Sequence, residues 1–390
     1  MKDELLTRGV EDILVRESLE KKLASGKTLR IKLGFDPTSA HIHIGRAIIL
    51  RKLRAFQDLG HQVVFIVGDF TAQVGDPSDK LEKRPMLKRE EINKNLKNYK
   101  DQIGKIVDIK KAEFHYNSEW LSKLGFQEIS ELAESFSVQQ MSSRRNFKDR
   151  FDKGEEISLR EFLYPLMQGY DSVAVKADVE LGGFDQLFNL KAGRIVQKHY
   201  GLPEQDILTC SMLEGTDGRK MSSSWGNVIA ITDAPNDMYG KVMSLRDALI
   251  VKYFLLCTDL SQAEIKEIEK SLAGGANPKD SKMRLAREIV KIYHGEKDAF
   301  SAEKNFIETF KKGGLPTDVQ EVSAKNGELL SEVLFQAKVV DSKSEFSRLI
   351  KEGAISIVET EEKITDREYK IEKSVSLRVG KKRFIKIQVK

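Results

Sequence analysis

The sequence predicts an α/β fold built on a parallel sheet, followed by an α-helical domain and a small α+β module. Three segments predict the sheet: "TLRIKLGFD" alternates polar and apolar residues like a strand, "GRAIILRKLRAFQDLG" repeats apolar residues at helical spacing, and "QVVFIVGDF" is an almost continuous apolar run. Strand, helix and strand within about 40 residues indicate a parallel βαβ unit. With 390 residues, the chain is long enough for two or three domains.

The composition is that of a soluble globular protein, with 40% hydrophobic and 32% charged residues. No apolar run approaches the roughly 18 to 20 residues of a membrane-spanning helix. The N-terminal segment "MKDELLTRGVEDILVRESLEKKL" mixes acids and bases, which predicts a surface helix and not a signal peptide. Cys210 and Cys257 lie far apart without paired ligands, which excludes a disulfide framework and a cysteine zinc site. We therefore expect a cytoplasmic protein.

The alternation of helices and strands resumes after a charged, mainly helical insertion at about 85–155. A helix is expected over 158–173, then a strand at "KADVELGG", a helix at "FDQLFNLKAGRIVQKHYG" and a strand at "DILTCSML". After Trp225 the pattern is helical without buried strands, and beyond "GGLPTDVQEV" it becomes a short helical segment followed by basic strands. The expected domains are 1–225, 226–322 and 323–390.

The stretch "GFDPTSAHIHIGR" places two histidines between a predicted strand and a predicted helix. A solvated polar pair is one interpretation, and a metal site is another, although Asp36 is the only further ligand close by. A phosphate site explains more of the residues, because the helix begins near Gly45 and its N-terminus attracts anions. Thr38 and His43 can then donate hydrogen bonds to phosphate oxygens, and Gly45 permits close approach of the backbone.

The segment "YPLMQGYD" places Tyr164, Gln168 and Asp171 on one face of a helix. A polar stripe of this kind is often a solvated surface. Here the flanking residues are apolar, so an acid and an amide would be buried and need a polar ligand.

Five segments resemble the class I aminoacyl-tRNA synthetases, and their order resembles the bacterial-type tyrosyl-tRNA synthetase family. "HIHIGR" is similar to the HIGH signature and "KMSSS" to the KMSKS signature, and "GDFTAQVGDPSDK", "FLYPLMQGYDS" and "ELGGFDQLFNL" are similar to further segments of that family. The resemblance extends over nearly the whole chain. It implies a Rossmann-like catalytic domain, an anticodon-binding helical domain and a small RNA-binding domain like that of a ribosomal protein.

The implied reaction joins an amino-acid carboxylate to the α-phosphate of ATP and expels pyrophosphate, so charge on the leaving phosphates must be stabilised. The catalytic residues implied by the resemblance are Thr38, His43, Lys220, Lys80 and Arg84. The implied ATP-binding residues are Asp36, His43, Gly45, Gly183, Asp185, Lys220, Ser222 and Ser224. Mg²⁺ is expected to accompany ATP through its phosphates, without a metal site made of protein ligands.

The implied substrate is L-tyrosine. Tyr164 and Gln168 would hold its α-amino group together with Asp76, Asp171 would accept from its phenolic hydroxyl, and Gln186 would lie near its carboxylate. Phenylalanine would leave a buried Asp171 unpaired, which explains discrimination, and tyrosine enzymes of this class are themselves the standard example of that rule.

The end of the chain resembles an RNA-binding fold. The net charge of +5 is modest, but from Ser374 onward the chain has no acid. Residues expected to contact the backbone of tRNA(Tyr) are Lys343, Arg348, Lys351, Lys381, Lys382 and Arg383. An ordinary solvated face is the alternative, since Glu345 and Glu352 are interleaved.

Four positions depart from the family pattern. Arg46 stands where the first signature has His or Asn, and Ser223 where the second has Lys. Lys32 occupies a position at which one branch of the family has tyrosine, and Phe184 replaces a small residue. These substitutions leave the expected core of the site intact.

The sequence therefore predicts a tyrosine-activating synthetase that also charges tRNA. By resemblance we expect a homodimer with 114–138 at the interface. A tryptophan enzyme on the same fold is one rival, although an indole N–H needs a single acceptor and Gln168 and Asp171 supply two. A non-catalytic RNA-binding relative is the other rival, favoured only by Arg46 and Ser223.

Overall fold

The computed structural model describes residues 4–76, 88–311, 319–358, 360, 362–380 and 383–389. The chain divides into two units. The first runs to Ala234 and includes Lys241–Leu285, and the second comprises Pro235–Gly240 and the chain from Ala286 onward.

A six-stranded sheet forms the centre of the first unit. Its spatial order is β1 (Val10–Leu14), β6 (Asp206–Cys210), β5 (Val179–Gly183), β2 (Arg30–Phe35), β3 (Gln62–Val67) and β4 (Ala112–Tyr116). All neighbouring strands are parallel except β1, which pairs antiparallel with β6. The order reverses at β2, since the chain continues to β3 on one side and later returns to β5 on the other. In open parallel sheets, ligands bind at the carboxyl ends of the strands beside such a reversal.

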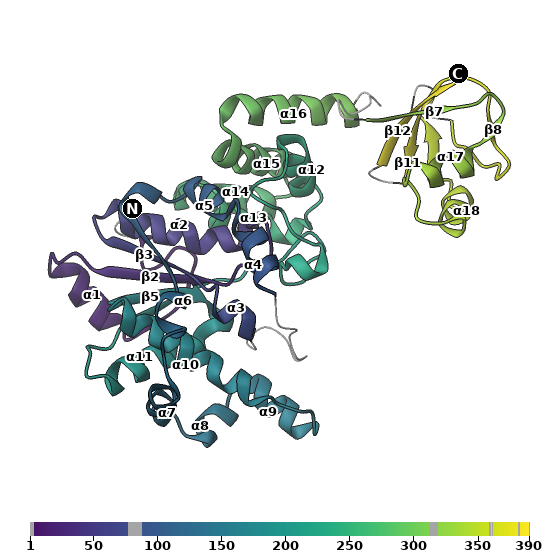
Figure 1. The fold of residues 1–390 in the computed structure, drawn as a ribbon. Helices are drawn as coiled ribbons and strands as arrows, with labels where there is room; N and C mark the ends of the chain where they lie inside the picture. Colours follow the sequence, from purple (N-terminus) through teal and green to yellow (C-terminus); the bar gives the residue numbers. More distant parts are fainter. Residues whose placement is uncertain are drawn as a thin grey trace. The chain divides into compact units, whose positions relative to one another are not determined.

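Helices cover both faces of this sheet, as the α/β prediction requires. Figure 1 shows α2 (Ile44–Asp58) on one side and α10 (Leu159–Ala174) with α11 (Leu187–His199) on the other. The expected parallel βαβ unit is confirmed as β2, α2 and β3. The strands β3 and β6 are almost wholly buried because helices cover them on both faces.

One expectation for the first unit is wrong in part, and the insertion contains a strand that the sequence did not predict. The N-terminal segment is not one surface helix, because the strand β1 precedes α1 (Arg16–Ala24) and Val15 between them has φ 61°. The described part of the insertion is mainly helical, as expected, and it also contains the strand β4, which extends the parallel sheet beyond β3. Its helices are α4 (Arg89–Leu96), α5 (Tyr99–Gly104), α6 (Ser118–Leu121), α7 (Phe126–Glu134), α8 (Val138–Ser142) and α9 (Arg145–Asp152), and α3 (Thr71–Val74) precedes them. Both unexpected strands are five residues long and depend on hydrogen bonds to a neighbour distant in sequence.

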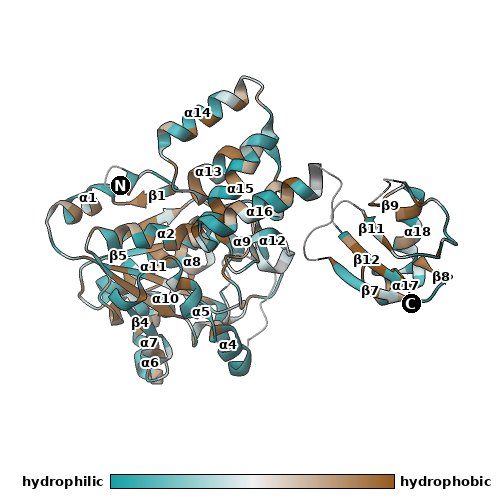
Figure 2. Cartoon of the chain, turned by 90° about the horizontal axis from the view of Figure 1, so that it is seen from above, coloured by the Kyte–Doolittle hydropathy of each residue, from teal (hydrophilic) through white to brown (hydrophobic). Residues whose placement is uncertain are grey.

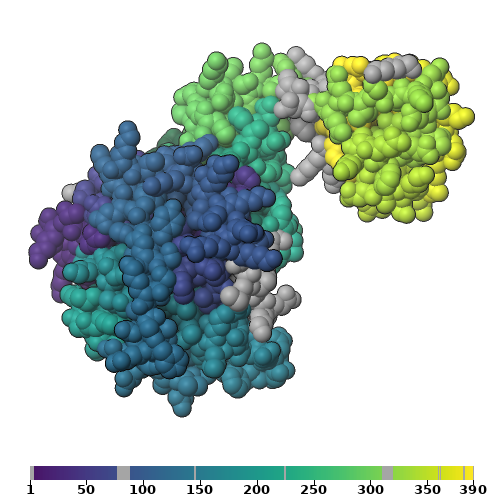
Figure 3. Space-filling model, viewed as in Figure 1, coloured from purple at the N-terminus to yellow at the C-terminus, as the bar shows by residue number. Residues whose placement is uncertain are grey.

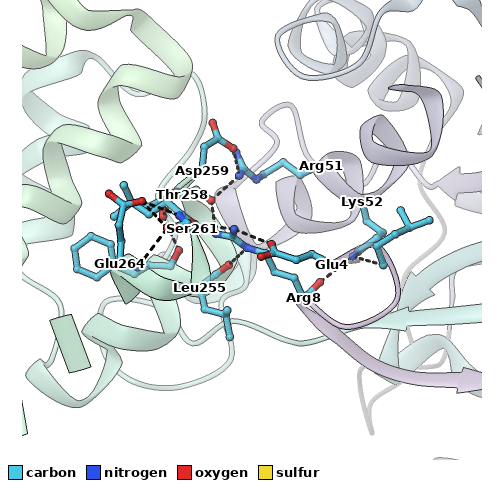
Figure 4. Close-up of polar contacts among 12 residues, drawn as sticks. Glu4, Arg8, Arg51, Lys52, Leu255, Thr258, Asp259, Ser261 and Glu264 are labelled. Carbon is cyan, nitrogen blue, oxygen red and sulfur yellow. Dashed lines mark hydrogen bonds and ion pairs between the residues drawn. The ribbon is translucent and has the colours of Figure 1, made fainter. Parts of the chain in front are cut away.

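The helix α13 (Ile250–Cys257) packs on α2, and basic side chains bind the carbonyls at its C-terminal end. Arg8 donates to the carbonyl oxygens of Leu255, Thr258 and Leu260 at 2.9, 2.8 and 2.7 Å, as Figure 4 shows in part. Arg51 donates to the carbonyl of Thr258 at 2.8 Å. The last carbonyls of a helix have no partner within the helix, so these contacts join the N-terminal segment to the helical region.

The region after the sheet is helical, as expected. It contains α12 (Pro235–Met243), α13, α14 (Gln262–Ala273), α15 (Pro278–His294) and α16 (Glu296–Lys311). In the part of the chain that the structure covers, no helix combines the length and the apolar character needed to cross a membrane. Cys210, the last residue of β6, and Cys257, the last residue of α13, are free thiols and are buried.

The C-terminal module contains β7 (Gln320–Ala324), β8 (Glu328–Leu329), α17 (Leu330–Gln336), α18 (Lys343–Lys351), β9 (Ile355–Ile357), β10 (Lys370–Ile371), β11 (Val375–Val379) and β12 (Arg383–Val389). Its four-stranded sheet has the order β7, β12, β11, β9. The expected helices and later strands are present, but the strand β7 precedes the helices because it pairs in parallel with β12.

The module has a hydrophobic core of its own. Seventeen buried residues between Ala324 and Ile387 form one cluster, with Leu330, Leu377 and Ile385 fully buried. Figure 2 shows apolar residues in brown along β11 and β12, and Figure 3 shows the outer surface of the module, in yellow-green and yellow, as a closely packed body. Since all members of the core lie within the module, its packing does not depend on other parts of the chain.

Candidate active site

A pocket of about 440 Å³ opens at the carboxyl ends of β2 and β5, beside the reversal in strand order. It is lined by residues from the two parallel strands, the first turn of α2, one face of α10 and the segment after β6. The predicted site residues that line it are Asp36, Thr38, His43, Gly45, Asp76, Tyr164, Gln168, Asp171, Gly183, Asp185, Gln186, Lys220 and Ser222. The structure therefore brings together segments that are up to 186 residues apart, from Asp36 to Ser222.

Lys80, Arg84, Lys381 and Lys382 fall outside the described residues. Ser224 belongs to the short 3₁₀ helix Ser223–Trp225, directly after the pocket residue Ser223.

His43 caps the N-terminus of α2. Its Nδ1 accepts a hydrogen bond from the backbone N–H of Arg46 at 3.3 Å. Burial, with smaller contributions from Arg46 and Lys220, lowers the pKa of His43 to about 3. The imidazole is therefore neutral near pH 7, and because Nδ1 accepts, we assign its proton to Nε2, which can donate to an anion.

Arg46 follows in the same turn and also lines the pocket. Its guanidinium donates to the Thr38 hydroxyl at 3.3 Å and to the Tyr99 hydroxyl at 3.4 Å, and lies 5.8 Å from the ring centre of Phe35. The side chain thus joins the loop after β2 to α5 and adds positive charge to this part of the pocket.

Asp36, at the end of β2, connects two walls of the pocket. Its Oδ1 accepts from the Thr71 hydroxyl at 2.7 Å, and its Oδ2 accepts from the Tyr164 hydroxyl at 2.8 Å. Burial and nearby carboxylates raise the pKa of Tyr164, so its hydroxyl stays protonated and donates. A Cβ on Gly68 would lie 2.0 Å from Asp36 Oδ1 and 2.4 Å from Thr71 Oγ1, so only glycine fits there.

Asp76 accepts hydrogen bonds from two amides of the β5–α11 region. Gln186 donates to its Oδ2 at 2.6 Å and Asn189 to its Oδ1 at 3.2 Å. The buried guanidinium of Arg144 lies 3.7 Å from the same Oδ1 and also lies over the rings of Phe147 and Phe188. A carboxylate held in this way can attract a ligand ammonium group.

Asp171 is buried at the far end of the α10 stripe. Trp120 Nε1 donates to its Oδ1 at 2.8 Å, and Asn117 Nδ2 donates to its Oδ2 at 3.3 Å. Burial raises the pKa of Asp171 to about 7, against the opposing effects of Lys32, Trp120 and Asn117. Each carboxylate oxygen keeps a further acceptor position, so the group can bind a hydroxyl of a ligand.

Lys32 lies beneath the pocket and does not line it. Its fully buried ammonium is 2.9 Å from Glu180 Oε1 and donates to the carbonyl of Gln168 at 2.8 Å and to the Ser172 hydroxyl at 2.7 Å. Glu180 Oε1 also accepts from Gln168 Nε2 at 3.1 Å. This buried ion pair therefore orients Gln168 from below.

Lys220 ion-pairs with Asp185 across the mouth of the pocket, with 2.7 Å between Nζ and Oδ2. Gly183 lies directly before this acid in the pocket wall, and a Cβ there would lie 2.5 Å from Asp185 Oδ1. The neighbouring Phe184 is 46% exposed and does not line the pocket.

The sequence analysis missed several residues that orient the predicted ones: Gly68, Thr71, Asn117, Trp120, Arg144 and Asn189. Gly68 and Thr71 belong to the quoted segment "GDFTAQVGDPSDK", so their position was visible in the sequence but their contact with Asp36 was not. Asn117 and Trp120 follow β4, the strand that the sequence did not predict. Without that strand, nothing placed them beside Asp171.

In the C-terminal module, Arg348 and Lys351 are exposed on α18. Lys343 lies 3.7 Å from Glu332. Arg383 instead donates to Glu345 at 2.8 Å and to the carbonyl of Val339, so its guanidinium joins two parts of the module.

The arrangement combines anion donors at the start of α2 with buried acceptors along α10. A phosphate chain, which needs hydrogen-bond donors, can therefore bind beside an amino acid whose ammonium and hydroxyl groups need acceptors. A site of this kind can activate a carboxylate by positioning and electrostatic stabilisation, without a nucleophilic side chain.

Comparisons with known proteins identify relatives of the chain. The family model described as class I tRNA synthetases (W and Y) matches residues 24–311. Tyrosine–tRNA ligase of Carboxydothermus hydrogenoformans is 46% identical over 400 residues, which cover 98% of this chain and 97% of that protein. Tyrosine–tRNA ligase of Thermotoga maritima is 44% identical over 387 residues, covering 98% of this chain and 96% of that protein.

Solved structures share the fold. Tyrosyl-tRNA synthetase from Archaeoglobus fulgidus, complexed with L-tyrosine, superposes with a TM-score of 0.61 at 22% identity and covers 77% of this chain and 98% of that one. A truncated mitochondrial tyrosyl-tRNA synthetase from Coccidioides posadasii gives a TM-score of 0.62 at 24% identity, covering 77% and 89%.

Proposed function

The chain belongs to the class I tRNA synthetase family of the tryptophan and tyrosine enzymes, and on that premise we propose which of its residues carry out each step. The reaction is that of a tyrosine–tRNA ligase. L-Tyrosine and ATP give tyrosyl-adenylate and pyrophosphate, and tyrosine then passes to the 3′ end of tRNA(Tyr).

Tyrosine binds along α10 in this proposal. Asp76, Tyr164 and Gln168 receive the α-amino group, Asp171 accepts from the phenolic hydroxyl, and Gln186 lies at the carboxylate. The observation that carries the proposal is Asp171, a buried carboxylate that lines the pocket with Trp120 and Asn117 as donors. Phenylalanine would leave this group without its ligand hydroxyl, and burial makes that loss costly.

ATP binds between the start of α2 and the segment after β6. Thr38 and neutral His43 donate to the β- and γ-phosphates, and Gly45 lets the chain approach them. Asp185 receives the ribose hydroxyls beside Gly183, and Lys220 leaves its ion pair with Asp185 to bind phosphate. The remaining residues assigned to this step are Asp36, Ser222, Ser224, Lys80 and Arg84.

Mg²⁺ enters with ATP as part of the substrate. The four described carboxylates that line the pocket already hold hydrogen bonds or ion pairs: Asp36 with Thr71 and Tyr164, Asp76 with Gln186, Asp171 with Trp120 and Asn117, and Asp185 with Lys220. These groups fit a metal carried by phosphates better than one held in a protein cage.

Residues 1–225 form the catalytic domain, which contains the pocket. The parts of the chain after it bind tRNA(Tyr): 226–322 bind the anticodon region and 323–390 bind the tRNA backbone. Exposed Arg348 and Lys351 on α18 support the last assignment, together with Lys343, Lys381, Lys382 and Arg383. The compartment proposed for this activity is the cytoplasm.

The enzyme acts as a homodimer in this proposal. Four large apolar side chains are exposed on helices that pack around one hydrophobic cluster: Phe126 on α7, Val138 on α8, Phe151 on α9 and Leu159 on α10. Exposed apolar groups gathered in this way are typical of a protein–protein interface. Two of them belong to the expected interface segment 114–138.

The direct test is amino-acid-dependent exchange of labelled pyrophosphate into ATP without tRNA, with tyrosine, phenylalanine and tryptophan offered separately. Exchange with tyrosine alone is the expected result. Equal exchange with tryptophan would contradict the role of Asp171, and folded protein without exchange would contradict the proposed residues as a whole.

A further inference from the structure

The pocket contains two described cations, and they differ in their partners. Lys220 forms an ion pair with Asp185 at 2.7 Å. The contacts of Arg46 with described residues are all to neutral groups, the hydroxyls of Thr38 and Tyr99 and the ring of Phe35. Among the residues that the structure describes, no carboxylate lies within ion-pair distance of Arg46. Its charge is therefore free to meet an anionic ligand.

The position of Arg46 indicates which anionic group it can bind. The side chain leaves the first turn of α2, three residues after His43, and its guanidinium donates to the hydroxyl of Thr38 at 3.3 Å. A guanidinium has five N–H donors, and the two hydroxyls occupy two of them. The remaining donors can form a bidentate contact with a phosphate group at the place where the proposed function puts the β- and γ-phosphates.

The segment after β6 contributes a cation to the pocket lining that is already paired with an acid, since Lys220 binds Asp185. Ser223 lines the pocket where the family signature has its second lysine, so the segment after β6 offers Lys220 as its one cation among the lining residues. The pocket therefore carries the guanidinium of Arg46 on α2, and the loop carries the paired ammonium of Lys220 and an uncharged hydroxyl at Ser223.

We propose that Arg46 is a catalytic residue that binds the pyrophosphate leaving group and replaces the cation absent at Ser223. This role rests on the proposed function. The tyrosine carboxylate oxygen attacks the α-phosphorus, the bond between this phosphorus and the bridging oxygen breaks, and its electron pair stays on pyrophosphate. No proton moves in this step, and Arg46 stabilises the charge that develops on the leaving group.

The experiment compares Arg46→Ala and Arg46→Lys with the parent enzyme. Arg54→Ala is the matched control, because Arg54 lies on the same helix, carries the same charge and pairs with Asp58 outside the pocket. Three quantities are measured: the rate of tyrosyl-adenylate formation, the KM for pyrophosphate in the reverse reaction, and the Kd for tyrosine without ATP. The parent must first show exchange, so failure of the proposed function is recognised separately.

Arg46→Ala is expected to slow adenylate formation roughly 100-fold and to raise the KM for pyrophosphate at least about tenfold. The Kd for tyrosine should stay unchanged, and Arg46→Lys should recover part of the pyrophosphate affinity. Adding Ser223→Lys to Arg46→Ala should also recover it, because the ammonium restores a cation to the same pocket. An unchanged KM for pyrophosphate in Arg46→Ala would overturn the proposal, as would an equal loss of tyrosine binding, which indicates a structural role.

Discussion

Burial favours the neutral form of both Asp171 and His43, and it therefore raises the pKa of the acid and lowers the pKa of the imidazole. The pKa of Asp171 rises to about 7, and that of His43 falls to about 3. His43 is therefore a constant donor across the physiological range, whereas Asp171 changes charge within it. The pH dependence of the tyrosine site should accordingly come from the acid.

Tyrosine binding should weaken as the pH falls through about 7, because protonation removes the charge that strengthens the contact with the phenolic hydroxyl. Trp120→Phe removes a donor to ionised Asp171 and keeps an aromatic ring. The pKa should rise further, so the midpoint in kcat/KM for tyrosine should move to higher pH. Tyr116→Phe, an exposed residue of β4, is the control. An identical midpoint in parent and Trp120→Phe would contradict this assignment.

The same pKa has a consequence for stability. Because the folded protein binds the Asp171 proton more tightly than the unfolded chain does, the free energy of unfolding should decrease as the pH rises from about 4 to about 7. At about 1.4 kcal/mol per unit, this term can reach about 4 kcal/mol.

At the scale of elements, the sequence predicted the helices and strands that have a clear hydrophobic pattern of their own, and it missed strands that form only by pairing with a distant strand. The helix α2 and the strands β2 and β3 carry their pattern in their own residues, and α10 carries the stripe of Tyr164, Gln168 and Asp171 that the structure places in the pocket. The strands β1, β4 and β7 are short and partly exposed, and each exists because a distant strand pairs with it. Trp120 and Asn117 were missed for the same reason.

The contact between Arg8 and the end of α13 gives a prediction for an element. Arg8→Ala leaves the carbonyl groups of Leu255 and Leu260 without this donor, while that of Thr258 keeps Arg51, and should lower the free energy of unfolding by about 2 to 3 kcal/mol. Urea unfolding measures the change. Arg16→Ala, which removes an exposed arginine paired with Glu20, should cost less than about 1 kcal/mol. Equal losses in both variants would contradict a specific role of Arg8 at this helix end.

At the scale of the whole molecule, the exposed apolar side chains on α7 to α10 predict that a charge placed among them converts the dimer to a monomer. Leu159→Asp places a charge on an 82% exposed residue at the first position of α10, where an acid suits the helix dipole and the helix should persist. Sedimentation should therefore show a folded monomer in place of a dimer. Val15→Asp changes an exposed apolar residue outside these helices and should remain dimeric. Dimeric Leu159→Asp would place the interface elsewhere.

The exposed basic residues Arg348 and Lys351 on α18 predict how tRNA binding by the C-terminal module depends on salt concentration. The double variant Arg348→Ala with Lys351→Ala should weaken binding of tRNA(Tyr) and reduce the slope of log affinity against log salt by about 1 to 2. Pyrophosphate exchange should not change, because the module has its own core and the pocket lies in the first unit. Lys373→Ala, at another exposed position of the module, should keep the parent slope. A parent slope in the double variant would exclude this face as the contact.

The two buried thiols should react slowly with alkylating reagents in the folded enzyme. Cys210 and Cys257 are both 1% exposed, and burial raises the pKa of each to about 12, so almost no reactive thiolate exists at neutral pH. A single cysteine introduced on the surface thus becomes a unique attachment point for a fluorophore, with no need to remove the native ones. Conversely, the rate at which the native thiols are labelled measures how often β6 and α13 open, because Cys210 and Cys257 are the last residues of these two elements.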